Sequence, residues 1–194
     1  MDTGKQLWVL TGGNGAGKST FYRLCLQPRG MAFVNADQIA RDIAPDNPEQ
    51  ASYEAASHAA LLRQALLEEG VSFCYETVFS HPSKIDFVAE AKARGYEVIL
   101  VFVHLDNSML NKARVSQRVA EGGHNVPEDK IETRLPRTLD NVKVAMALAD
   151  QVHVLDNSRS DQPLRRMARI HNGRAEVLQA GCPDWVSALL DDYL

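Results

Sequence analysis

The feature that most constrains the fold of this chain is a glycine-rich segment near its start, Gly-Gly-Asn-Gly-Ala-Gly-Lys-Ser at residues 12–19. It matches the Walker A pattern GxxxxGK[ST] in full. An apolar, β-rich run at residues 6–10 precedes it, and a helical pattern at residues 18–26 follows. In such a loop, backbone N–H groups and the helix N-terminus surround phosphate oxygens. The sequence therefore predicts an α/β protein with a P-loop.

The residue types of this loop suit a nucleoside triphosphate. Lys18 can reach the β- and γ-phosphates, and the hydroxyl of Ser19 can ligate magnesium. We therefore expect ATP or GTP, together with Mg²⁺, as the cofactors. The residues expected to bind them are Gly12, Gly13, Asn14, Gly15, Ala16, Gly17, Lys18, Ser19 and Thr20.

The order of the predicted elements indicates a parallel sheet flanked by helices. Nearly continuous apolar runs at residues 6–10, 31–35, 71–78, 97–105 and 151–155 predict strands that are covered on both faces. Helical patterns lie between them at residues 18–26, 48–69, 83–94, 108–121 and 128–149, and we expect a kink or break at Pro136. No linker interrupts this alternation, so we expect a single domain over residues 1–194.

Residues 159–194 follow a different pattern and are expected to form a C-terminal appendage. Two β-capable runs, at residues 167–170 and 174–178, flank Asn172-Gly173. Asn-Gly between two such runs favours a tight turn, so the appendage is predicted to contain a hairpin. A short helix is expected at residues 184–192.

Composition limits the classes of partner. The net charge of −4 argues against a nucleic-acid partner. The longest apolar run, residues 98–103, is far shorter than the ~20 residues that a membrane-spanning helix needs. The three cysteines are widely spaced and form neither a metal-binding nor a redox motif, and the N-terminus lacks the pattern of a signal peptide. We therefore expect a cytoplasmic protein without a membrane or nucleic-acid partner.

Polar residues follow two predicted strands at the edge where a parallel sheet binds ligands. Asp37 can accept a proton from a substrate hydroxyl or hold magnesium through water; capping of a helix that begins at Gln38 is the structural alternative. Glu76 and Thr77 are expected to bind the substrate or support magnesium, and a structural ion pair is the alternative for Glu76.

A glycine pair at residues 122–123, between two helical patterns, predicts a hinged lid over residues 118–137. Its closure would bring Arg118 and Arg134 onto the transferring phosphoryl group, and Arg137 is expected to bind substrate. His124 lies in the hinge, where a role in acid–base chemistry is the weaker interpretation. Asp106, which follows the run at residues 97–105, leaves open a Walker B role.

The set of motifs resembles the zeta-toxin family, and more narrowly its short branch of bacterial P-loop ATPases. The resemblance covers about residues 5–158. It rests on the strand–GGNGAGKST–helix unit, Asn35-Ala36-Asp37, Glu76-Thr77, and the segment RVAEGGHNVP with the arginines that follow it. The family resemblance implies a fold like that of nucleoside monophosphate kinases, with a parallel five-stranded sheet in the order 2-3-1-4-5.

The same resemblance implies an ATP- or GTP-dependent kinase that phosphorylates a hydroxyl of a small molecule such as UDP-N-acetylglucosamine, and a possible antitoxin protein as partner. The implied roles are triphosphate and magnesium binding for Lys18 and Ser19, general base for Asp37, sugar binding for Glu76 and Thr77, and charge stabilisation for Arg118 and Arg134. A nucleotide-dependent switch or ATPase that acts through a protein partner remains the alternative. A nucleic-acid end kinase shares the glycine loop but is disfavoured by the acidic net charge.

Overall fold

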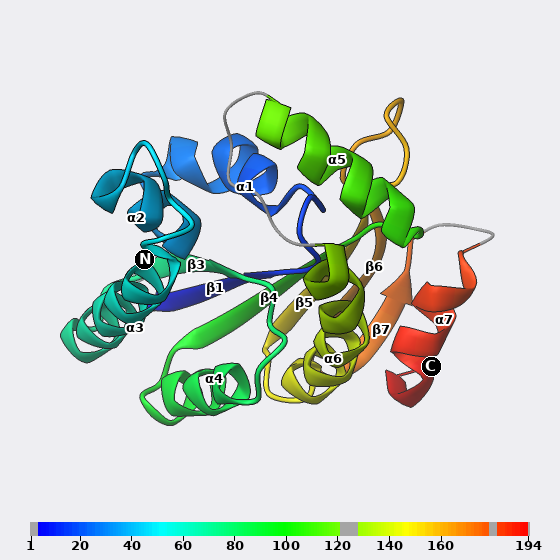
Figure 1. Ribbon diagram of the computed structural model, residues 1–194. Coiled ribbons are helices and arrows are strands. Elements are labelled where there is room, and N and C mark those ends of the chain that lie inside the picture. Colours follow the sequence, from blue (N-terminus) through cyan, green and yellow to red (C-terminus); the bar gives the residue numbers. More distant parts are fainter. Residues whose placement is uncertain (1–3, 121–127, 179–181, 194) are drawn as a thin grey trace.

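The computed structural model describes residues 4–120, 128–178 and 182–193. Within these residues a central sheet lies between two layers of helices (Figure 1). Its strands are β1 (Gln6–Thr11), β2 (Ala32–Val34), β3 (Phe73–Thr77), β4 (Glu97–His104), β5 (Gln151–Asp156), β6 (Arg165–His171) and β7 (Arg174–Val177).

The strands form one sheet in the order β2-β3-β1-β4-β5-β6-β7. The first five are parallel to one another, whereas β6 and β7 pair antiparallel with their neighbours. The predicted parallel order 2-3-1-4-5 is thus confirmed, and the sheet is larger than predicted because the C-terminal hairpin extends it. The turn of that hairpin is Asn172-Gly173, both with positive φ (51° and 70°), as a type I′ turn requires.

Helices cover both faces of the sheet (Figure 1). They are α1 (Lys18–Phe21), continued by a π-helical turn over Tyr22–Leu26, α2 (Ala36–Ile43), α3 (Ser52–Glu69), α4 (Ser83–Ala93), α5 (Ser108–Ala120), α6 (Glu128–Met146) and α7 (Asp184–Leu190). None of the helices in the described ranges has the length and apolarity needed to span a bilayer.

Two clusters of buried side chains, one on each face of the sheet, form the core. Helices α3, α4, α6 and α7 pack on the larger cluster, which contains Phe73, Tyr75 and Leu100. The segment around α1 and the start of α5 pack on the smaller one, which contains Cys74 and Val101. Alternate residues of β3 and β4 enter opposite clusters, which explains why these strands read as continuous apolar runs.

Two helix predictions were wrong in detail. Of the kink or break expected at Pro136, the break is absent, since α6 runs through this residue from Glu128 to Met146. Packing of Val142, Ala145 and Met146 in the larger core cluster stabilises the helix beyond the proline. The helix predicted over residues 48–69 begins only at Ser52. Residues 48–51 form turns instead, in which a backbone N–H donates to the carbonyl three residues earlier, as from Ala51 to Pro48.

The topology brings the C-terminal ends of β1, β2 and β3 to one edge of the sheet. Thr11, the last residue of β1, lies opposite Thr77, the last residue of β3, and Leu10 lies opposite Glu76. The glycine loop follows β1, and Asn35 follows β2. The polar residues singled out in the sequence therefore meet at this edge.

Candidate nucleotide and acceptor site

The glycine loop adopts the curled backbone that phosphate binding requires. Gly12, Gly15 and Gly17 have positive φ values of 141°, 75° and 103°. A Cβ atom at Gly12 would lie 2.0 Å from the carbonyl oxygen of Val103, so only glycine can stand between β1 and β4 here. A Cβ atom at Gly17 would lie 2.4 Å from Nδ2 of Asn157.

Two buried asparagines from distant parts of the chain hold the loop from outside. Asn111 of α5 donates from Nδ2 to the carbonyl of Asn14 over 2.7 Å. Asn157, directly after β5, donates to the carbonyl of Ala16 over 2.8 Å and accepts from the backbone N–H of Leu164 over 3.0 Å. Asn157 therefore supports the loop from the end of β5.

Lys18 lies at the centre of the loop with its ammonium group directed back onto it. Its Nζ donates to the carbonyls of Gly12 and Gly13 over 3.0 and 2.9 Å, and only 5% of the residue is exposed. Glu76 approaches from the end of β3, with Oε1 3.7 Å from Nζ. The lysine is thus held in the loop that would receive the phosphates.

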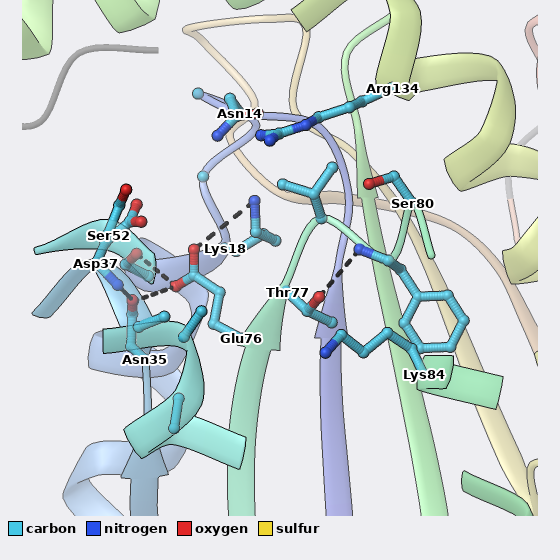
Figure 2. A pocket seen from close by; sticks show the side chains of 18 of the residues that line it. Asn14, Lys18, Asn35, Asp37, Ser52, Glu76, Thr77, Ser80, Lys84 and Arg134 are labelled. Carbon is cyan, nitrogen blue, oxygen red and sulfur yellow. Dashed lines mark hydrogen bonds and ion pairs between the residues drawn. The ribbon is translucent and has the colours of Figure 1, made fainter. Parts of the chain in front are cut away.

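Glu76 also connects the loop to the end of β2. Its Oε2 accepts a hydrogen bond from Oγ of Ser19 over 2.6 Å and another from Nδ2 of Asn35 over 3.0 Å (Figure 2). The Ser19 side chain and the Glu76 carboxylate thus present adjacent oxygens beside Lys18. Hard cations such as Mg²⁺ prefer oxygen ligands of this kind, so these residues fit a magnesium ion bound with a triphosphate.

Asp37 faces the same site without serving as the helix cap. Asn35 caps α2, because its Oδ1 accepts from the backbone N–H groups of Asp37 and Gln38 over 2.8 and 3.3 Å. The alternative in which Asp37 is the N-cap is therefore wrong. In the described part of the chain the Asp37 carboxylate makes no hydrogen bond or ion pair, and it lines the cavity beside the loop.

A cavity of about 540 Å³ opens between the loop and the helices that surround it. Volumes of several hundred Å³ suit a small-molecule ligand. Its wall brings together the predicted residues Lys18, Ser19, Thr20, Asp37, Glu76 and Thr77. The Thr77 hydroxyl accepts a hydrogen bond from the N–H of Phe79 over 3.0 Å, which orients the backbone after β3.

Comparison with known proteins gives the family. The family model described as zeta toxin matches residues 2–165. The chain belongs to the zeta-toxin family. It is also 33% identical over 137 residues to an uncharacterized protein of Haemophilus influenzae, a match that covers 67% of this chain and 97% of the relative. The resemblance inferred from the sequence motifs is therefore confirmed.

Solved structures similar to this zeta-toxin family member share its P-loop kinase fold. A chain of the AvrRxo1-ORF1:ORF2 complex with ATP superposes with a TM-score of 0.76 at 14% identity, covering 98% of this chain and 72% of that one. A chain of the PezAT toxin–antitoxin system of Streptococcus pneumoniae gives a TM-score of 0.62 at 16% identity, covering 81% and 70%. At these identities the likeness shows the fold alone.

The structure separates the three arginines predicted for the lid. Arg134 of α6 lines the cavity (Figure 2). Arg137 is exposed, is not part of the cavity wall, and donates from Nε to the carbonyl of Thr133 over 3.2 Å. Residue Arg118 belongs to α5, but its side chain lies outside the described residues, as does all of His124.

The residue proposed for Walker B lies away from this cavity. Asp106 is exposed after β4, and its backbone N–H donates to Oγ of Ser158 over 2.8 Å. It is absent from the residues that line the cavity in the described part of the chain. Glu76, rather than Asp106, is the carboxylate in contact with Lys18 and Ser19.

Four basic residues of the cavity wall were missed by the sequence reasoning: Arg23 of the π-helical turn after α1, Arg63 of α3, Lys84 of α4 and Arg114 of α5. Burial lowers the pKa of Arg63, and burial together with the nearby charge of Arg63 lowers the pKa of Lys84. Spacing gave a usable signal for Arg63, which stands four residues after Ala59 and four before Leu67 on the buried stripe of α3.

Proposed function

We propose that this zeta-toxin family member is an ATP- or GTP-dependent phosphotransferase whose acceptor is a hydroxyl group of a small molecule. The observation that carries the proposal is the position of Asp37. Its carboxylate lines the cavity beside Lys18. Aspartate often caps a helix N-terminus, but here Asn35 caps α2, so the Asp37 carboxylate is not used for capping. A carboxylate placed beside a phosphate-binding loop can accept the proton of an attacking hydroxyl.

Different residues of the cavity are proposed to accept the proton, to stabilise the phosphoryl charge and to bind magnesium. Asp37 takes the hydroxyl proton as the acceptor oxygen bonds to the γ-phosphorus and the bond to the β–γ bridging oxygen breaks. Lys18, Arg114 and Arg134 line the same cavity and are suited to offset the charge on the phosphoryl oxygens. Ser19 and Glu76 would hold magnesium, which when bound neutralises phosphate charge.

Family membership supports more specific proposals for the acceptor and for a protein partner. The acceptor is a nucleotide sugar of the UDP-N-acetylglucosamine type, and Glu76 and Thr77 lie in the cavity wall where such a substrate would bind. An antitoxin protein is the proposed partner, in line with similarity to chains from a toxin–antitoxin system and from the AvrRxo1-ORF1:ORF2 complex. The proposed location is the cytoplasm.

The test is transfer of labelled γ-phosphate from ATP to a panel of nucleotide sugars, nucleotides and other hydroxyl compounds. The wild-type chain should label one class of acceptor. The variant Asp37→Asn should lower kcat by about 10²–10⁴-fold, the range for loss of a general base, while it retains ATP binding. Asp42→Asn is the matched control, because Asp42 is an exposed residue of the same helix and is not part of the 540 Å³ cavity wall.

Two outcomes would contradict the proposal. Transfer by Asp37→Asn at a rate within a few-fold of wild type would remove Asp37 as the base. Release of free phosphate without labelling of any acceptor, in wild type, would favour a nucleotide-dependent switch that acts through a protein partner.

A further inference from the structure

Positive charge is concentrated in the cavity although the chain as a whole is acidic. Among the residues that the structure describes, the cavity wall contains six lysines and arginines and two carboxylates, Asp37 and Glu76, whereas the net charge of the chain is −4. Lys18 and Arg114 reach the cavity from the side of the sheet covered by α1 and α5. Arg63 and Lys84 come from α3 and α4, which cover the other face (Figure 1).

Arg63 is a buried cation that forms no ion pair with a carboxylate in the part of the chain that the structure describes. Only 9% of the residue is exposed, and its guanidinium carbon lies 5.1 and 5.3 Å from the ring centroids of Tyr75 and Phe87. Its Nε finds no hydrogen-bond acceptor within the described residues. Aromatic contacts compensate part of the free-energy cost of burying a guanidinium group. A buried N–H donor without an acceptor still lowers the stability of the fold.

Lys84 places a second positive charge beside the first. It is the second residue of α4, and its side chain extends toward Thr77 (Figure 2). The N-terminus of a helix carries partial positive charge, so a lysine is unfavourable there. Across the described ranges it makes no ion pair with a carboxylate, and it lines the same cavity as Arg63.

We propose that Arg63 and Lys84 form a subsite for a phosphate group carried by the phosphoryl acceptor. Two cations in one cavity wall, neither of them ion-paired with a carboxylate among the described residues, match the double negative charge of a phosphate. The planar guanidinium group also suits the phosphate oxygens. The subsite is separate from the glycine loop, which receives the donor nucleotide. The identification of the bound group with the acceptor rests on the proposed function, and it restricts the acceptor to phosphorylated hydroxyl compounds.

The test measures binding of inorganic phosphate to the full chain saturated with magnesium and a non-hydrolysable ATP analogue, so that the glycine loop is occupied. Isothermal titration calorimetry should detect one further phosphate site in wild type. Arg63→Met and Lys84→Met should each weaken it by about tenfold or more, because each removes a charge-assisted hydrogen-bond donor. Lys143→Met, at an exposed lysine of α6 outside the cavity wall, is the control and should bind as wild type does.

The variant Lys84→Met keeps the proposal testable if Arg63→Met does not fold, since Lys84 is only partly buried. Absence of a further phosphate site in wild type, or binding of phosphate by both variants with the affinity of wild type, would overturn the inference. Displacement of the phosphate by acetate at equal concentration would show a carboxylate site and would equally overturn it. No transfer reaction is needed, so a failure here is distinguishable from a failure of the kinase proposal.

Discussion

Replacement of Asn157 by alanine should destabilise the domain through the glycine loop. Asn157 is 7% exposed and makes two hydrogen bonds, to the carbonyl of Ala16 over 2.8 Å and from the N–H of Leu164 over 3.0 Å. Each contributes about 1 kcal/mol net, and a buried group left without a partner costs about 1–3 kcal/mol. Because water can enter the polar space left by the amide, we expect a loss of about 2–4 kcal/mol in the free energy of unfolding.

Urea unfolding followed by circular dichroism would measure this loss as a lower midpoint with an unchanged m value. In thermal unfolding it corresponds to a decrease in Tm of about 4–16 °C for a chain of this length. Asn111→Ala is the matched comparison, because Asn111 makes one such bond, to the carbonyl of Asn14 over 2.7 Å. The Asn111→Ala variant should lose about half as much free energy of unfolding as Asn157→Ala. A wild-type midpoint for Asn157→Ala would refute the argument that these bonds hold the loop.

Two more predictions concern pH and the arginines. Burial lowers the pKa of His104 to about 4, so the unfolded chain, with a pKa of about 6.5, binds the proton first as pH falls. The free energy of unfolding should therefore decline between about pH 6.5 and 4, by about 3 kcal/mol from this residue, and urea titrations of His104→Gln should show a shallower slope. Arg134→Ala should lower kcat/KM for phosphoryl transfer by about tenfold or more, whereas Arg137→Ala should leave it near wild type, since only Arg134 lines the cavity. Equal effects of the two arginine variants would contradict this placement.

The sequence predicted the glycine loop and its setting because these depend on local chemistry. A full Walker A pattern between an apolar run and a helix requires glycine at positions of positive φ, and the structure shows this at Gly12, Gly15 and Gly17. The positions of Asp37 and Glu76 followed from the rule that parallel strands direct their C-terminal ends to one edge. These predictions needed only the order of the elements along the chain.

Contacts between distant parts of the chain could not be predicted in the same way. Asn111 and Asn157 support the loop from 97 and 141 residues away from their acceptors, and asparagine is common in loops for unrelated reasons. Arg63 resembles an ordinary exposed helix residue unless its spacing from buried alanines is noticed. The position of the hairpin in the sheet could not be predicted either, because Asn172-Gly173 specifies a turn but not the strand with which the hairpin pairs.

The antiparallel hairpin also determines which strands stand at the borders of the sheet. Without β6, the backbone of the six-residue strand β5 would present unpaired N–H and C=O groups on one side. With the hairpin in place, the border strands are β2, of three residues, and β7, of four residues including Arg174 and Glu176. Very short border strands, and charged side chains such as those of β7, disfavour pairing with another chain. The C-terminal strands thus protect this sheet against self-association and aggregation.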